Sequence, residues 1–347
     1  MPSYRETRVD IVEFPLELPH ELPQAIDDMS LAFHLGIRNS TMWWMIHEKK
    51  RKMYNVFRLP KRGRPGRYRD IQNPIDALKN VQKNILARFL SPVPVMAHVG
   101  AYVPGRSCRD TAAQHVGKGV IVSLDIRDFF PTVRRSMIKR YLHRTIGYGY
   151  RVASLLAELM TYSNFVPQGA PTSGLIANLI AHERFDRRIL RDLKTLDPQW
   201  AYTRYSDDID LSHPEVQEPD RLTAVIALVR DAIENAGFKL NQKKTKVEPR
   251  WKRQKVLGMV VNEKVNIPRY EYMRTRSIIH NCLVDGFENQ YKRAGMNSIS
   301  GLKAHLRGKL AFFKQVDPVK AQRLKDQFDL ACQTHADVKE NEVRFDD

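Results

Sequence analysis

Two adjacent aspartates, Asp207 and Asp208, stand between two β-prone segments in the stretch AYTRYSDDIDLSH (residues 201–213). Neighbouring carboxylates raise the cost of ionising each other, so the pair is either a solvated turn or part of a cation site. A third aspartate, Asp125, lies at the end of the apolar run GVIVSLDI (residues 119–126). Three carboxylates at one point suit Mg²⁺, and two such ions can clamp an in-line phosphoryl displacement. The three aspartates are therefore candidate catalytic residues.

The elements around these aspartates must bring them together. Residues 119–126 are typical of a buried strand, and residues 202–212 predict a strand, a tight turn and a second strand. Helices are predicted at 20–56, 74–90, 134–162, 175–193, 219–236 and from 270 onward, strands at 238–247 and 255–268, and a basic hairpin at 61–71. This interleaving predicts an α+β or α/β core, with helices packed on a mostly antiparallel sheet.

The charge of the chain indicates a polyanionic partner. Its 57 lysines and arginines outnumber 39 acids, giving a formal net charge of +18. Residues 49–69 contain no acid, residues 243–276 are also strongly basic, and aromatic residues lie among the cations in both stretches. Cations interleaved with aromatics suit a nucleic-acid backbone with exposed bases, although a charge run is also compatible with a solvated face.

The remaining composition favours a cytoplasmic protein. Three cysteines are widely scattered without a CxxC pair, which argues against a zinc site or a disulfide framework and fits a reducing cytosol. The sequence contains no long uncharged apolar run, so we expect no membrane span. The N-terminal stretch contains acids and lacks an apolar core, so we do not expect a signal peptide.

Five ordered motifs carry a family resemblance. SLDIRDFFPTV, VPQGAPTSGLIANLI, YTRYSDDIDLS, GFKLNQKKTKV and VLGMVVN resemble the successive motifs of a reverse transcriptase, and most closely those of bacterial retron-type reverse transcriptases. The resemblance implies an α+β right-hand polymerase with fingers, a palm of antiparallel sheet and packed helices, and a helical thumb. It divides the chain into an N-terminal helical region (1–55), fingers (56–118), palm (119–262, with finger elements around 134–166), and thumb with a C-terminal tail (263–347).

The resemblance also implies roles for individual residues. Asp125, Asp207 and Asp208, helped by the Ile126 carbonyl, would hold two Mg²⁺ ions, for which Mn²⁺ could substitute. The residues expected to bind the incoming nucleotide are Arg69, Lys61, Phe130, Gln168, Gly169 and Lys244. Those expected to contact primer or template are Tyr205, Ser206, Val256, Leu257 and Gly258. His115 is expected to make either a structural polar contact or an RNA contact.

The implied activity is RNA-directed DNA synthesis from dNTPs. A structured noncoding RNA would serve as template and primer, the product would be an RNA–DNA duplex giving a short msDNA-type DNA, and a separate effector protein would act with it in antiphage defence. The chain departs from the retron pattern at Thr111, Gly174, Ser206 and Leu257. These departures concern the retron assignment and not catalysis, so a non-retron defence reverse transcriptase with different priming or templating stays open. Two further alternatives are a group II intron-like enzyme and an RNA-binding protein without activity.

Overall fold

The computed structural model describes residues 22–48, 50–60, 66 and 68–342. The chain forms two compact units, and each is assembled from separated stretches of sequence. The first unit comprises the residues up to Ala97 together with Asp128–Arg184. The second comprises His98–Arg127 together with the residues from Phe185 onward. The two units are described in turn.

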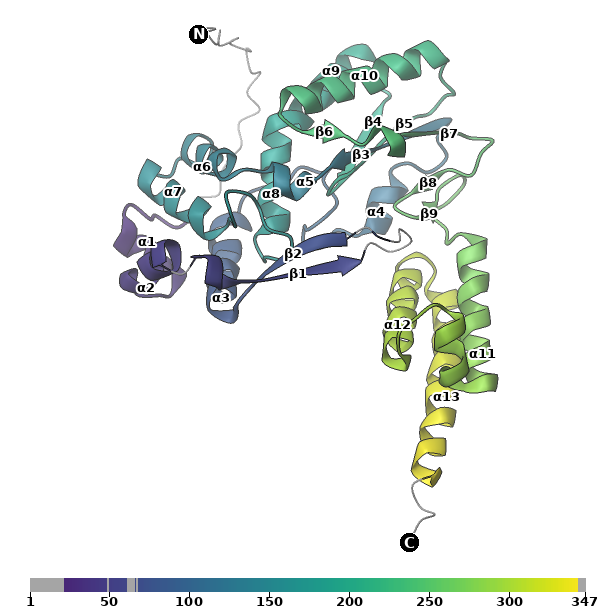
Figure 1. Ribbon diagram of the computed structural model, residues 1–347. Coiled ribbons are helices and arrows are strands. Elements are labelled where there is room, and N and C mark those ends of the chain that lie inside the picture. The colour runs from purple at the N-terminus through teal and green to yellow at the C-terminus, as the bar shows by residue number, and fades with distance from the viewer. Residues whose placement is uncertain (1–21, 49, 61–65, 67, 343–347) are drawn as a thin grey trace. The chain divides into compact units, whose positions relative to one another are not determined.

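The first unit is mainly helical and carries one exposed hairpin (Figure 1). Its strands, β1 (Tyr54–Pro60) and β2 (Tyr68–Pro74), pair antiparallel. Its helices are α1 (Asp28–Leu35), α2 (Asn39–Trp43), η1 (Trp44–Glu48), η2 (Lys50–Met53), α3 (Asp76–Ile85), η3 (Leu86–Leu90), α5 (Phe129–Thr132), α6 (Arg135–Arg144), α7 (Tyr150–Leu159) and α8 (Ser173–Ala181), and η4 (His182–Asp186) begins in this unit and ends in the second. Every residue of α8 is buried, which explains its almost uninterrupted apolar sequence SGLIANLIA.

The second unit is built on an antiparallel sheet of order β4-β5-β3-β6, with β7 also paired to β3. Its strands are β3 (Val120–Arg127), β4 (Ala201–Tyr205), β5 (Asp208–His213), β6 (Lys239–Leu240) and β7 (Lys246–Pro249). A separate short hairpin joins β8 (Lys255–Val256) to β9 (Met259–Val260). Because β3 is covered on both edges and both faces, its run VIVSLDI is buried or half-buried throughout, as its apolar composition predicts.

Helices α9 (Arg187–Leu196) and α10 (Pro219–Asn235) lie on one side of this sheet, and α4 (Cys108–Ala113) lies on the other (Figure 1). A proline at the first turn of α10 sits where its missing N–H costs nothing. The N-cap Ser107 of α4 and Asp110 form a reciprocal capping box. A 3₁₀ turn, η5 (Gln242–Lys244), connects β6 to β7.

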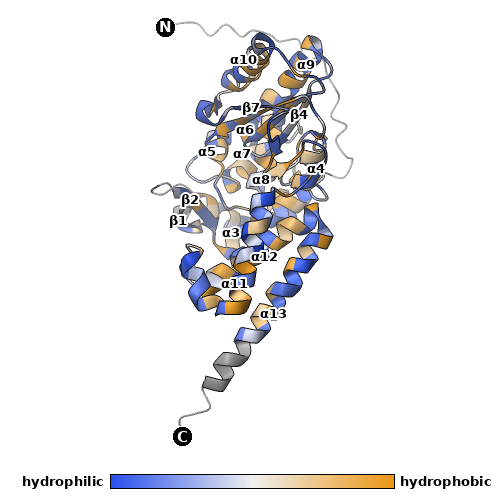
Figure 2. Ribbon diagram, turned by 90° about the vertical axis from the view of Figure 1, so that its right-hand side faces the viewer, coloured by the Kyte–Doolittle hydropathy of each residue, from blue (hydrophilic) through white to orange (hydrophobic). Residues whose placement is uncertain are grey.

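Three C-terminal helices complete the second unit: α11 (Arg269–Arg293), α12 (Ile299–Val316) and α13 (Pro318–Glu342). Buried apolar residues from all three form one cluster that includes Ile279, Leu306 and Phe328. Figure 2 shows that hydrophobic and hydrophilic positions alternate along these helices, as expected for helices that bury one stripe. Gly286 breaks α11 with φ 79°, a left-handed conformation that glycine adopts readily.

Most of the predicted elements are present, with four differences in extent. The predicted strand 238–247 is two strands, β6 and β7, separated by η5, and the predicted strand 255–268 is the short hairpin β8–β9. The predicted helix 20–56 is four shorter helical segments, α1, α2, η1 and η2, and the last of them stops at Met53, where β1 begins at Tyr54. The predicted helix 134–162 is two helices, α6 and α7, separated by a segment that contains Gly147 with φ 94°. Among the described helices, none combines the length and the hydropathy that a membrane span requires.

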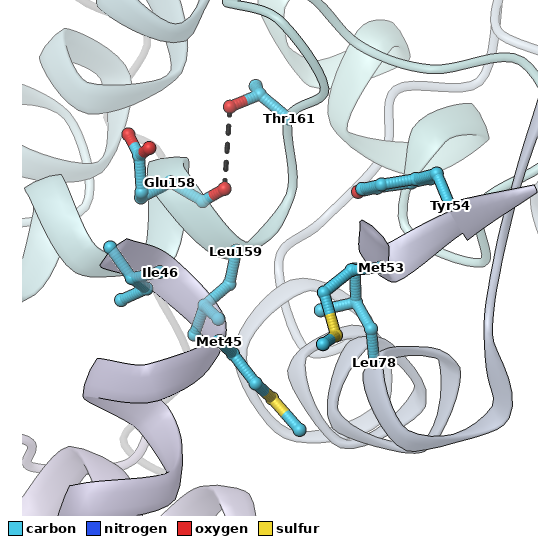
Figure 3. A pocket seen from close by; sticks show the side chains of 8 residues that line it. All are labelled: Met45, Ile46, Met53, Tyr54, Leu78, Glu158, Leu159 and Thr161. Carbon is cyan, nitrogen blue, oxygen red and sulfur yellow. Dashed lines mark hydrogen bonds between the residues drawn. The ribbon is translucent and has the colours of Figure 1, made fainter. Parts of the chain in front are cut away.

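A small apolar pocket lies within the first unit. It is lined by Met45, Ile46, Met53, Tyr54, Leu78, Glu158, Leu159 and Thr161 (Figure 3). It has room for about one water molecule. The pocket is therefore a packing defect in a methionine-rich core, and is too small to hold a nucleotide.

Candidate active site

The β4–β5 hairpin closes through a two-residue turn, Ser206–Asp207. Tyr205 pairs with Asp208 across the hairpin, so Asp208 is the first residue of β5. Ser206 has φ 62°, a left-handed conformation that such turns favour at their first position and that glycine usually supplies. A serine held there stores backbone strain, which persists only where the surroundings fix it. The conformation of this turn therefore fixes the positions of Asp207 and Asp208 at the end of the hairpin.

Asp125 and Asp208 lie directly opposite each other on β3 and β5. Opposite residues of antiparallel strands project from the same face, with Cβ atoms about 5 Å apart. The N–H of Ile126 donates to the carbonyl of Asp207 at 2.8 Å, which fixes the turn against β3. Asp125 is 6% exposed, Asp207 is half-buried and Asp208 is exposed. The three predicted catalytic residues thus meet at one end of the sheet, on an edge that solvent reaches.

Lys244 and Asn241 add polar groups to this cluster. The Lys244 ammonium forms an ion pair with the Asp125 carboxylate. Asn241 donates from Nδ2 to Asp125 Oδ1 at 3.2 Å, and from its main-chain N–H to the Asp125 carbonyl at 2.8 Å. Lys243, the neighbouring lysine, is exposed. Of the two lysines, Lys244 is therefore the one at the carboxylates, and its charge offsets part of theirs.

A buried ion pair supports the turn from behind. Arg204 and Asp186 are both fully buried, and Arg204 Nη2 lies 2.8 Å from Asp186 Oδ2. Tyr202 donates its hydroxyl to Asp186 at 2.5 Å, and His98 Nε2 lies 3.2 Å from the same carboxylate. Burial favours the neutral acid, but the charge of Arg204 and these hydrogen bonds outweigh it and lower the pKa of Asp186.

The same arginine reaches the turn itself. Arg204 Nη1 donates to the carbonyl of Ser206 at 3.2 Å. The strained residue is thus tied to a buried charge network through its main chain. Its side chain is held differently: the Ser206 hydroxyl is buried and has no hydrogen-bond partner among the described residues. Shape and main-chain contacts, not a side-chain hydrogen bond, keep Ser206 in place.

A polar strip continues from the carboxylates along the face of the sheet that α4 covers. Ser123 donates to Asp210 at 2.5 Å, and burial, reinforced by the nearby charge of Asp208, raises the pKa of Asp210 to about 7. The His115 ring lies further along, with Nδ1 2.8 Å from Ser212 Oγ and Nε2 2.7 Å from Thr203 Oγ1. Because His115 is fully buried with both nitrogens engaged, it makes a structural polar contact.

The β8–β9 hairpin carries the other residues predicted to contact the primer. Leu257 (φ 49°) and Gly258 (φ 82°) form its two-residue turn, and both have the positive φ that a type I′ turn requires. Val256 is fully buried and packs with Ala112 and Ile121. Of the predicted contact residues in this hairpin, only Leu257 and Gly258 therefore present atoms to solvent.

The first unit holds the remaining predicted nucleotide-binding residues. Arg69 is exposed on β2, and Phe130 is half-buried in α5 beside the buried Phe129. Gln168 exchanges two hydrogen bonds with Gln72 of β2, one donated by each main-chain N–H, at 2.8 and 3.0 Å. Gly169 has φ 119°, and a Cβ there would lie 3.2 Å from Ile71. Lys61 lies outside the described residues.

The site therefore falls into two groups, one in each unit. The second unit gathers the aspartates, Lys244, the Ser206 turn and the 257–258 turn, whereas the first gathers Arg69, Phe130, Gln168 and Gly169. Sequence reasoning did not single out Asn241, Asp186 or Arg204. One feature of the sequence could have indicated the Arg204–Asp186 pair. Arg204 lies within the buried strand YTRY, and a buried guanidinium requires a buried partner.

A comparison with known protein families shows which class of enzyme this site belongs to. The family described as reverse transcriptase (RNA-dependent DNA polymerase) matches residues 59–261, a span that contains every one of the predicted site residues. The chain belongs to this reverse transcriptase family, and its α+β architecture is that of a right-hand polymerase. It is an RNA-directed DNA polymerase.

Similar proteins of known identity indicate which type of reverse transcriptase this chain resembles. The retron Mx65 reverse transcriptase of Myxococcus xanthus is 34% identical over 324 residues, covering 87% of this chain and 71% of that protein. The retron Ec86 reverse transcriptase of Escherichia coli is 29% identical over 300 residues, covering 86% and 87% of the two chains. These matches confirm the retron-type resemblance and imply an RNA template.

Members of the family depend on divalent metal ions, and the donor set here fits such an ion. Three carboxylates from β3 and the β4–β5 turn lie together at the end of a sheet, and one of them is open to solvent. Hard oxygen ligands of this kind are what Mg²⁺ and Mn²⁺ take. The Lys244 ammonium already at Asp125 shows that the cluster attracts positive charge.

Proposed function

We propose that this chain reverse transcribes a cognate structured noncoding RNA into a short single-stranded DNA of the msDNA type. The observation that carries the proposal is the register of Asp125 opposite Asp208, with Asp207 in the adjoining turn. The similarity to named retron reverse transcriptases along most of the chain supports the retron part. The same RNA would serve as template and as primer, dNTPs would be the substrates, and an RNA–DNA duplex would form during synthesis.

In the proposed chemistry Asp125, Asp207 and Asp208, with the Ile126 carbonyl, would hold two Mg²⁺ ions, for which Mn²⁺ could substitute. Ions bound there would activate the primer hydroxyl and neutralise charge on the leaving pyrophosphate. Lys244 can exchange its ion pair with Asp125 for the negative charge that develops on the leaving group. Asn241 keeps the Asp125 carboxylate oriented while that exchange occurs.

The other predicted residues bind and position the substrates. In the first unit, Arg69 and Lys61 grip the triphosphate, Phe130 excludes a 2′-hydroxyl, and the Gln168–Gly169 loop packs against the nucleotide. In the second unit, Tyr205, Ser206, Val256, Leu257 and Gly258 position the primer and template. This assignment makes residues 56–118 fingers, 119–262 palm with finger elements around 134–166, and 263–347 thumb and tail, behind an N-terminal helical region (1–55).

The biological setting is also part of the proposal. The enzyme acts in the cytoplasm, together with a separate effector protein, in antiphage defence. Its formal charge of +18 favours stable association with a structured RNA. Its three free cysteines are compatible with a reducing compartment.

The proposal is tested by the nucleic acid that the protein carries. The wild-type protein and an Asp207→Ala, Asp208→Ala variant are purified from the native host, and the bound nucleic acid is sequenced after RNase or DNase treatment. We expect short DNA covalently joined to one structured RNA in the wild type alone. Protein-linked or untemplated DNA would contradict the retron assignment and indicate another defence clade. RNA without DNA, even after dNTPs and Mg²⁺ are added, would contradict synthesis altogether.

A further inference from the structure

The turn between β7 and β8 presents a tryptophan to solvent. Trp251 is 70% exposed, whereas Trp44 is 39% and Trp200 is 7% exposed. Its neighbours Arg250, Lys252 and Arg253 are exposed as well, and no acid occurs between Pro249 and Lys255. Large aromatic rings are usually mostly buried, so a ring this open among three cations calls for a partner.

The 250–253 turn is rigidly built. Asn262 donates from Nδ2 to the carbonyls of Arg250 (3.1 Å) and Lys252 (2.8 Å) and accepts from the Gln254 N–H at 3.0 Å. The Gln254 side chain, fully buried, donates to the carbonyls of Lys118 and Glu248, each at 3.0 Å. A turn braced at both ends loses little conformational entropy when its exposed side chains bind a ligand.

The turn is separate from the carboxylate cluster. Pro249 pairs with Val120 at the N-terminal end of β3, whereas Asp125 is five residues further along the same strand. At the usual rise per residue of a strand, the two ends are about 17 Å apart. All of these residues belong to the second unit, so the separation does not depend on how the two units are arranged.

We propose that Trp251 is a stacking platform for an unpaired base of the RNA, with Arg250, Lys252 and Arg253 binding the flanking phosphates. The aromatic ring supplies a flat apolar surface that any base can cover, and the cations supply the sequence-independent attraction. The ligand is therefore a single-stranded segment of RNA, because bases inside an A-form duplex are not available for stacking. The inference rests on the proposed function in that it takes the partner to be RNA.

The test compares Trp251→Ala and Trp251→Phe with the wild-type chain. The probes are a fluorescein-labelled oligouridine of about 12 nucleotides and a blunt RNA duplex of similar length. We expect Trp251→Ala to bind the single strand about tenfold more weakly, in line with the loss of one base–aromatic stack, and to bind the duplex like the wild type. Trp251→Phe should retain most of the single-strand affinity. Because this variant lacks the Trp251 indole, it should no longer show the quenching of tryptophan fluorescence that RNA causes in the wild type.

Three further measurements separate the possible failures. Lys252→Gln should lower the salt dependence of single-strand binding by about one unit of slope, which Trp251→Ala should not do. Thermal unfolding should be unchanged in Trp251→Ala, which shows that this variant is folded, and DNA synthesis by the wild type on a generic RNA template with an annealed DNA primer tests the proposed function separately. Unchanged single-strand affinity in Trp251→Ala, with quenching retained in Trp251→Phe, would overturn the platform. An inactive wild type would instead contradict the proposed function while leaving the platform testable by binding.

Discussion

At the scale of single residues, the main feature is a strained serine beside the paired aspartates. Ser206 combines φ 62° with a buried hydroxyl that has no hydrogen-bond partner in the described part of the chain. The residue was expected to be small because it lies where the primer terminus is proposed to pack. The backbone adds a second constraint, because a β-branched side chain is strongly disfavoured at positive φ.

Substitutions at Ser206 should separate these constraints. Ser206→Ala removes an unsatisfied hydroxyl, so stability should be unchanged or should rise by up to about 1 kcal/mol, with activity within about twofold of wild type. Ser206→Val adds bulk and a β-branch at positive φ, and should reduce primer extension at least about tenfold. Thermal unfolding and steady-state primer extension check both variants. An active, stable Ser206→Val protein would show that neither space nor backbone is limiting here.

The sequence predicted the aspartate cluster for a physical reason. Asp125 lies near the end of a strand too apolar to be exposed, and Asp207 and Asp208 lie at a tight turn, so a sheet that pairs these strands must bring them together. The ion pair between Lys244 and Asp125 could not be derived in the same way. It depends on the 3₁₀ turn η5, which decides which of two adjacent lysines faces the sheet.

At the scale of elements, two buried polar groups attach neighbouring segments to the sheet. His115, just after α4, binds hydroxyls on β4 and β5, and Asp186, at the start of α9, binds Arg204 on β4. Sequence patterns predicted the helices and strands but not these attachments, because hydrophobic periodicity contains no information about which polar side chains meet.

The first attachment makes a pH-dependent contribution to stability. Burial, with a smaller contribution from the charge of Lys118, lowers the pKa of His115 to about 4, whereas an unfolded histidine titrates near 6.5. Between these values the unfolded chain binds a proton that the folded chain does not. The contribution of neutral His115 is therefore complete above pH 6.5 and is lost as the pH falls towards 4.

His115→Gln isolates this contribution, since glutamine does not titrate. The free energy of unfolding of wild type minus that of His115→Gln should fall by about 2 kcal/mol between pH 7 and pH 4.5. Denaturant titrations of both proteins at the two pH values measure it. A difference that stays constant, or grows on acidification, would show that His115 is not held neutral in the folded protein.

The second attachment predicts strong coupling between Arg204 and Asp186. Arg204→Met or Asp186→Asn alone leaves a buried group without its partner and should destabilise the protein by about 3–5 kcal/mol. The double variant should lose much less than the sum of the two single losses. Thermal and denaturant unfolding of the wild type, the two single variants and the double variant measure these losses. Primer extension by the double variant then shows whether synthesis requires the hydrogen bond from Arg204 to the Ser206 carbonyl. Additive losses would show that the pair is not an interacting unit.

At the scale of the whole molecule, charge and chain topology are the relevant properties. The charge of +18 was read directly from composition, and it predicts a strong salt dependence of RNA binding. The sequence predicted finger elements inserted within the palm around 134–166, but it did not predict that residues 98–118 belong to the same compact unit as β3 and its partners β5 and β7. Such long-range pairing follows from register, which local sequence patterns do not fix.

The salt prediction concerns affinity alone. If about six phosphates or more are contacted, raising monovalent salt from about 50 to 200 mM should weaken binding of a structured RNA about a thousandfold. Turnover on saturating template should change much less, because the chemical step does not include that association. Filter binding and primer extension in the same buffers test this. A loss of affinity below about tenfold would mean that few phosphates are contacted despite the charge.

The most direct test of the central claim is RNA-templated primer extension by Asp208→Asn, with Asp128→Asn as the matched control. Both variants remove one charge and keep the size of the side chain, and both positions are exposed on the surface. Asp208 faces Asp125 across the sheet, whereas Asp128 follows β3 and opens α5. We predict that Asp208→Asn loses at least about a thousandfold in rate while remaining folded, and that Asp128→Asn stays within a few-fold of wild type. Near-normal synthesis by a folded Asp208→Asn protein would contradict the assignment of the carboxylate cluster as the catalytic centre.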